Sequence, residues 1–85
     1  MYGGIALEEM QRLLHVLRDV NEDVDFTCNA ALIDDGIIDS FDIIAIIGAL
    51  DEAYGIHIKA ADIEPKNFNS VQAIYETVER YRKTV

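Results

Sequence analysis

The chain has no tryptophan, one proline and one cysteine among its 85 residues. Because proline interrupts helices, its near absence leaves long stretches free to be helical. The lone Cys28 cannot form an internal disulfide, and we expect it to be a small buried side chain in a reducing compartment. Two scattered histidines and one cysteine do not make a zinc site, and no stretch has the spacing of a calcium loop, so we expect no metal.

Basic residues are missing from the middle of the chain. Between Asp19 and His57 there are ten acids and no lysine or arginine, and the formal net charge of the whole chain is -9. Nucleic acid is a poor partner for such a surface, because phosphate binding needs a basic face. A field of one sign suits docking onto basic proteins, but a solvated acidic surface would also serve solubility alone. Both interpretations stay open at this point.

Long hydrophobic runs are also absent. The longest, from Ile43 to Leu50, is far too short to cross a membrane, and the N-terminus has no basic residue ahead of its apolar positions, as a secretory signal would. Hydrophobic residues nevertheless make up 51% of the chain, which is typical of a packed core rather than of disorder. We predict one domain over residues 1–85, and expect a soluble, cytoplasmic monomer without membrane contact.

Hydrophobic spacing predicts an all-α fold, a small four-helix bundle with three main helices and a short one. The expected helices cover residues 5–19, 40–54, 62–67 and 70–82. The first should bury Leu7, Met10, Leu13, Leu14 and Leu17. A long loop over residues 20–38 should be anchored by Val24, Phe26, Ala31, Leu32 and Ile33. Loops of this length in a compact domain tend to be functional.

Capping residues indicate where the helices begin and end. Asp39 is the expected N-cap of the second helix, and Asp42 three residues later makes an acidic variant of the capping box. Gly55 is the expected C-cap of that helix. Asn69 and Gln72 predict a second capping box at the start of the last helix.

Ser40, directly after the Asp39 cap, could be a capping residue, a nucleophile or a point of attachment. A catalytic serine needs a base, but His15 falls within the first helix and His57 follows the second helix at its far end. The G-x-S-x-G turn of the hydrolases is absent as well. Because Asp39 already serves as the cap, we expect the hydroxyl to be presented to another protein for modification.

The second helix is apolar on two sides. An inner face is expected from Ile43, Ile46, Ile47, Leu50 and Tyr54. Phe41, Ile44 and Gly48 form a second stripe, which we expect to be partly exposed and to contact partners, with the glycine allowing close approach. The alternative is that Ile44 lies under the long loop as ordinary core.

The segment 35-DGIIDSFDIIAIIGALDEAYGI-56 resembles the centre of the phosphopantetheine carrier proteins, which include acyl, peptidyl and D-alanyl carriers. The similar motifs are Asp39-Ser40-Phe41, the LDEAYGI run with Ile58 after it, and 68-FNSVQAI-74 at the start of the last helix. The resemblance extends over roughly residues 5–82 in element order and length, as well as in motif.

The resemblance implies that Ser40 carries covalent 4′-phosphopantetheine, added from coenzyme A by a separate, magnesium-dependent phosphopantetheinyl transferase. The thiol of that arm would hold acyl or aminoacyl groups as thioesters, so the protein would be an acyl carrier and not an enzyme. The implied partners are the transferase, a loading ligase or acyltransferase, and later enzymes of a biosynthetic pathway that dock on the acidic second helix. The expected contact residues are Asp39, Phe41, Asp42, Ile44, Gly48, Asp51 and Glu52.

One position departs from the pattern of fatty-acid carriers. Ala45 stands where they commonly have a glutamate, which favours a specialised pathway over housekeeping fatty-acid synthesis. The alternative to a carrier is an acidic helical interaction module that is never modified, in which Ser40 is only a helix-start residue.

Overall fold

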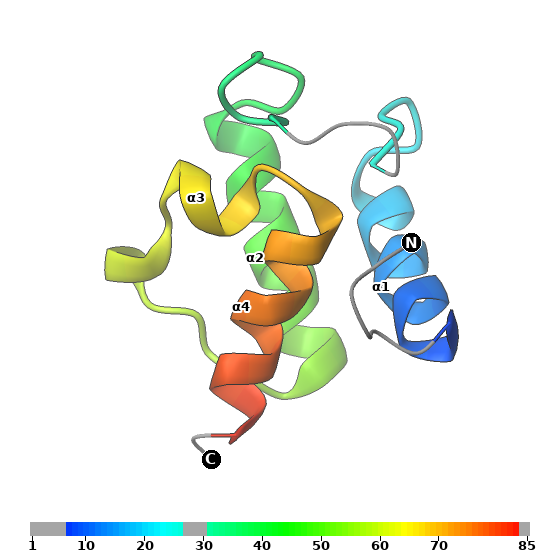
Figure 1. The fold of residues 1–85 in the computed structure, drawn as a ribbon, viewed down its shortest axis with the longest axis vertical. Helices are drawn as coiled ribbons and strands as arrows, with labels where there is room; N and C mark the ends of the chain where they lie inside the picture. The colour runs from blue at the N-terminus through cyan, green and yellow to red at the C-terminus, as the bar shows by residue number, and fades with distance from the viewer. Residues whose placement is uncertain (1–6, 27–30, 84–85) are drawn as a thin grey trace.

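The computed structural model describes residues 7–26 and 31–83, and over these ranges it is all-helical (Figure 1). Its elements are α1 (Leu7–Val20), α2 (Ser40–Tyr54), the 3₁₀ turn η1 (Ala60–Asp62), α3 (Pro65–Phe68) and α4 (Val71–Lys83). The predicted all-α class is therefore confirmed, with three main helices, one short helix and a long first connection. None of these helices is both long enough and apolar enough to span a membrane. Cys28 and the first two residues of the predicted 5–19 helix lie outside the described ranges.

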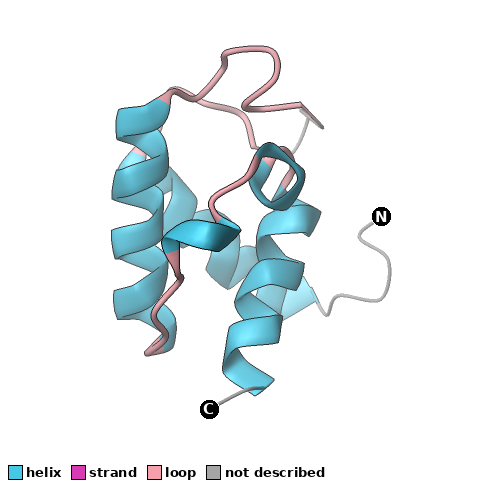
Figure 2. Cartoon of the chain, turned by 90° about the vertical axis from the view of Figure 1, so that its left-hand side faces the viewer, coloured by secondary structure: helices cyan, strands magenta, loops and turns pink. Residues whose placement is uncertain are grey.

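The three long helices share one apolar core. α1 packs chiefly against α2, and α4 contacts both of them. Figure 2 shows α2 and α4 side by side, with η1 and α3 in the connection between them. Each long helix buries three apolar side chains in the core: Met10, Leu13 and Leu17; Ile46, Ile47 and Leu50; Val71, Ile74 and Val78. Amphipathic spacing thus identified the inner faces of α1 and α2, because the buried positions recur every three to four residues.

Leu7 is an exception to the predicted inner face of the first helix. Its side chain is 70% exposed at the first position of α1. The apolar stripe thus continues one turn beyond the core, which begins at Met10. Sequence period alone marks a face of a helix and not how far along that face the neighbouring helices reach.

The long connection before α2 contributes directly to the core. Phe26 and Leu32 are fully buried, while Val24, Ala31 and Ile33 are partly buried. Five predicted anchors therefore turn inward in the described part of the loop. Burial of large apolar side chains is the main favourable term available to a domain of this size, so this loop is part of the fold rather than an appendage.

Tyr54, in the last turn of α2, links all three long helices. Two guanidinium groups lie over its ring, with the Cζ of Arg12 at 4.5 Å and that of Arg82 at 5.5 Å from the ring centroid. Arg82 also contacts the carboxylates of Glu9, at 3.5 Å, and Glu79, at 2.9 Å. Burial raises the pKa of the Tyr54 phenol. Cation–π contacts thus fasten the end of the bundle that lies at the opposite end of α2 from Ser40.

The connection after α2 is held by polar side chains from both neighbouring helices. The Asp51 carboxylate accepts the backbone N–H of Ile58 at 3.0 Å. The Tyr81 hydroxyl accepts the N–H of Lys59 at 3.0 Å and donates to the carboxylate of Asp62. These bonds satisfy backbone groups that no regular ladder would satisfy, and they fix the path of the chain towards α3.

Candidate functional site

Ser40 is the first residue of α2, and the residue before it makes the helix cap. Asp39 has an extended backbone, with φ -108° and ψ -173°, and its Oδ1 accepts the N–H of Asp42 at 2.9 Å. The Asp42 Oδ2 accepts the N–H of Asp39 in return, at 3.2 Å. The predicted acidic capping box is therefore confirmed. At the other end of α2, Gly55 takes the left-handed conformation, with φ 64°, that the C-cap prediction required.

The capping box leaves the hydroxyl of Ser40 unused. Ser40 is exposed, and its side chain has no hydrogen-bond partner within residues 7–26 and 31–83. The structure thus excludes the capping role for this serine. Neither histidine is engaged with it, since His15 lies 3.7 Å from Asp19 and His57 lies 3.8 Å from Asp51. The described residues also contain no cluster of ligands that could hold a metal ion.

An exposed apolar stripe runs along α2 from Ser40. Phe41 is 82% exposed and Ile44 is 67% exposed, so the prediction of a second, outward-facing stripe is confirmed. The alternative in which Ile44 belongs to the core is wrong. Ala45 and Gly48 are also exposed and extend this surface. A Cβ added at Gly48 would meet no atom within 4 Å, so no internal contact requires a glycine there.

The acids of α2 differ in how free they are. Glu52 and Asp39 are exposed, whereas Asp42 and Asp51 are half-buried. The Asp51 side chain binds the Ile58 amide, and only 23% of it is accessible. Asp51 was expected to contact partners, but in the structure its carboxylate binds the backbone of the connection that follows α2. The outer face of α2 is consequently apolar in its middle, with exposed carboxylates near its two ends.

Asp42 is the acid for which a structural role and a docking role can be separated. Asparagine at 42 keeps an oxygen for the Asp39 amide but removes the charge, whereas alanine removes both. We expect Asp42→Ala to lower the free energy of unfolding by about 0.5–2 kcal/mol, and Asp42→Asn to lower it by less.

The sequence resemblance implies that a phosphopantetheinyl transferase modifies Ser40, so the measurement is thermal unfolding together with the rate of that modification. If partner enzymes recognise the negative charge of Asp42, Asp42→Asn should slow the modification of Ser40 and change the stability little. Glu79→Gln, on α4, is the matched control for loss of one negative charge. A normal rate for Asp42→Asn together with reduced stability would contradict a docking role.

The sequence pattern predicted that Asn69 caps the last helix, and this prediction is wrong. The cap is Ser70, whose Oγ accepts the N–H of Ala73 at 3.1 Å. The Asn69 side chain turns to the loop before α2, where its Oδ1 accepts the N–H of Ile33 at 2.9 Å. The prediction failed because asparagine and serine are both good caps and stand next to each other, so local pattern cannot choose between them.

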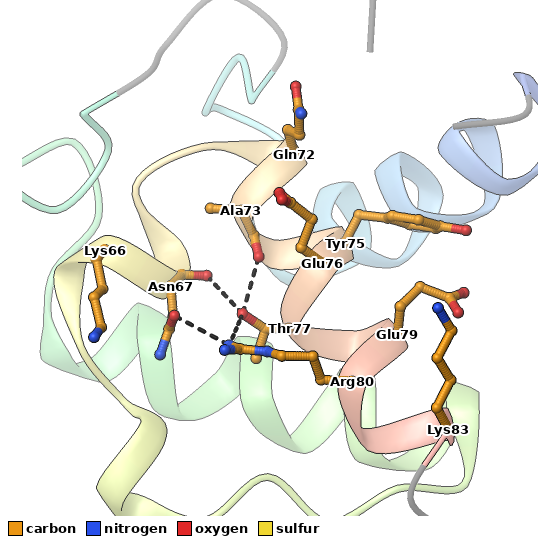
Figure 3. Close-up of a pocket in the computed structure, with 10 residues that line it drawn as sticks. All are labelled: Lys66, Asn67, Gln72, Ala73, Tyr75, Glu76, Thr77, Glu79, Arg80 and Lys83. Atoms are coloured by element: carbon orange, nitrogen blue, oxygen red, sulfur yellow. Dashed lines mark hydrogen bonds between the residues drawn. The ribbon is translucent and has the colours of Figure 1, made fainter. Parts of the chain in front are cut away.

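A shallow cavity of about 590 Å³ lies along α3 and α4 (Figure 3). One edge is a hydrogen-bond network in which the Arg80 Nη2 donates to Asn67 Oδ1 at 3.1 Å and to Thr77 Oγ1 at 3.2 Å. The Thr77 hydroxyl lies 2.9 Å from the carbonyl oxygen of Ala73, to which it donates. These polar groups satisfy one another, so the network's evident role is to join α3 to α4. No sequence pattern singled it out.

Comparison with models of protein families, with curated proteins and with solved structures gives no match to this chain. Interpretation of the site therefore depends on its own motif and geometry.

Proposed function

We propose that this protein is a thioester carrier that is modified with 4′-phosphopantetheine at Ser40. The observation that carries the proposal is the exposed hydroxyl of Ser40 at the first position of α2. Within the described residues it has no hydrogen-bond partner, because Asp39 and Asp42 make the capping box without it. A serine that neither caps, packs nor contacts a base is available to an external enzyme. The Asp39-Ser40-Phe41 motif and its distance from the LDEAYGI run support the same conclusion.

Transfer of phosphopantetheine requires from this chain mainly that the Ser40 oxygen is accessible. The Ser40 oxygen would form an ester bond to the pantetheine-linked phosphorus of coenzyme A. The pyrophosphate bond would break, 3′,5′-ADP would leave, and the hydroxyl proton would pass to a base of the transferase. The attached arm supplies a thiol that forms thioesters with acyl or aminoacyl groups. Exposure of Ser40 leaves room for such an arm. Both histidines lie near other side chains, Asp19 and Asp51, which agrees with a carrier that needs a separate enzyme.

Partner enzymes would contact the surface beside the modified serine. Phe41 and Ile44 provide apolar area next to Ser40, and exposed large apolar side chains grouped in this way mark interaction sites. The exposed acids Asp39 and Glu52 lie at the two ends of α2 and would select partners with basic residues around an apolar centre. The apolar middle, including Ala45, favours a pathway other than housekeeping fatty-acid synthesis.

Intact mass measurement tests the proposal. Co-expression with a phosphopantetheinyl transferase of broad specificity should add the mass of one phosphopantetheinyl group, and Ser40→Ala should abolish the gain. Ser70→Ala is the matched control, because Ser70 is the only other serine and should leave the gain intact. No gain in the wild-type protein, or a gain that persists in Ser40→Ala, would refute the proposal. The first of these results would favour the unmodified interaction module.

A further inference from the structure

Asn69 joins the α3–α4 junction to the loop that leads to Ser40. Its Oδ1 accepts two backbone N–H groups, from Ile33 at 2.9 Å and from Asp34 at 3.1 Å. Its Nδ2 donates to the Asp34 carboxylate at 3.1 Å, and its carbonyl oxygen accepts the N–H of Leu32 at 2.8 Å. One residue thus makes four hydrogen bonds to a segment more than thirty positions earlier in the chain.

The loop held in this way is continuous with the site. The Leu32 carbonyl oxygen accepts the N–H groups of Ile37, at 2.9 Å, and Ile38, at 3.1 Å. Leu32 and Ile38 are both buried, so the two ends of this turn are seated in the core. Only Asp39 separates Ile38 from Ser40, and Asp39 is itself bonded in the capping box. Hydrogen bonds or burial therefore constrain the path from the junction to Ser40 at several points.

The bonds to Asn69 are not needed to place α2 itself. Ile46 and Leu50 are fully buried and already seat this helix against α1 and α4. What the Asn69 contacts add is a defined shape for the loop, on which Asp34 and Asp35 are exposed close in sequence to Ser40. An enzyme that acts on Ser40 must fit over this loop, and misplacement of a reacting group by about 1 Å can cost about 100-fold in rate.

We propose that Asn69 is a positioning residue for the transfer of phosphopantetheine to Ser40. It acts through the loop 31–38 and does not touch the reacting atoms. This inference rests on the proposed function, and it adds that the shape of the loop before the modified serine is controlled from the junction between α3 and α4. A merely structural role would instead change stability and leave the kinetics of modification unchanged.

The first test measures kcat and KM of a purified transferase with coenzyme A and the unmodified full-length carrier. Asn69→Ala should lower kcat/KM by about tenfold or more, since orientation beside Ser40 is lost. Amide hydrogen exchange should accelerate at Ile33 and Asp34, whose N–H groups lose their acceptor. It should also accelerate at Leu32, whose acceptor is the backbone carbonyl of residue 69, because the rest of the contact is lost. Ile74→Val, a buried substitution in α4, is the control for loss of stability, and its kcat/KM should stay at the wild-type value.

The second test is a rescue. Asn69→Asp places two carboxylates together and should also lower kcat/KM. The double variant Asp34→Asn/Asn69→Asp exchanges donor and acceptor, keeps the net charge and can restore each hydrogen bond. It should return kcat/KM to within about twofold of wild type, because substitutions of two residues in contact are not additive and here compensate for each other. Asp34→Asn alone measures the effect of losing the negative charge at position 34.

The outcomes distinguish this inference from the proposed function. If the wild-type protein is not modified, the proposed function fails and this inference fails with it. If the wild type is modified and Asn69→Ala has the wild-type kcat/KM, only the inference fails. A double variant that remains as slow as Asn69→Asp would also overturn it, because the pairing with Asp34 would then not explain the effect.

Discussion

Alanine at Ile46 should lower the free energy of unfolding by about 2–5 kcal/mol, whereas alanine at Ile44 on the same helix should change it little. The two isoleucines are two residues apart, but Ile46 is fully buried and Ile44 is 67% exposed. Truncation in the core removes burial and leaves a cavity, while truncation at the surface removes neither close contacts nor much buried area. Denaturant unfolding of the two variants measures the difference directly.

The same pair of variants tests the partner surface. If the stripe with Phe41 contacts partner enzymes, Ile44→Ala should slow transfer to them while its unfolding curve stays near that of the wild type. Ile46→Ala, assayed where it remains folded, should keep a normal rate. The stripe would be structural if Ile44→Ala lost stability on the scale of Ile46→Ala while modification of Ser40 and transfer to partners stayed intact.

Leu32→Ala should destabilise the domain by about 2–5 kcal/mol, although Leu32 lies in a loop. Its side chain is completely buried and belongs to the apolar core. Its backbone also accepts and donates hydrogen bonds that shape the turn before α2. Because small domains are stable by only about 5–15 kcal/mol, the expected loss is a large share of the total.

Ile37→Ala is the matched control for the loop. Ile37 belongs to the same turn but is only partly buried, so its truncation should have the smaller effect on unfolding. Thermal or denaturant unfolding of both variants decides the matter. Equal and small losses would mean that the loop packs loosely on the core and could not keep a defined shape beside Ser40.

Local sequence determined the elements that depend on neighbours in the chain. The Asp39–Asp42 capping box and the Gly55 cap follow from residues within a few positions of each other, and both were predicted. The two apolar stripes of α2 were also predicted, because helical period alone assigns Ile44 and Ile46 to different faces. The serine after the cap was identified for the same reason, since its capping role was already taken by Asp39.

Only the tertiary structure decided which of several suitable groups makes each long-range contact. Asn69 and Ser70 are both good caps, and the choice between them depends on a loop more than thirty residues away. Asp51 could equally have been a free surface acid, but the returning chain brings the Ile58 amide to it. Hydrogen bonds between distant segments depend on how the helices pack and on no repeating pattern in the sequence. The position of Ser40 in space is therefore a property of the whole fold, while its chemical availability follows from the residues beside it.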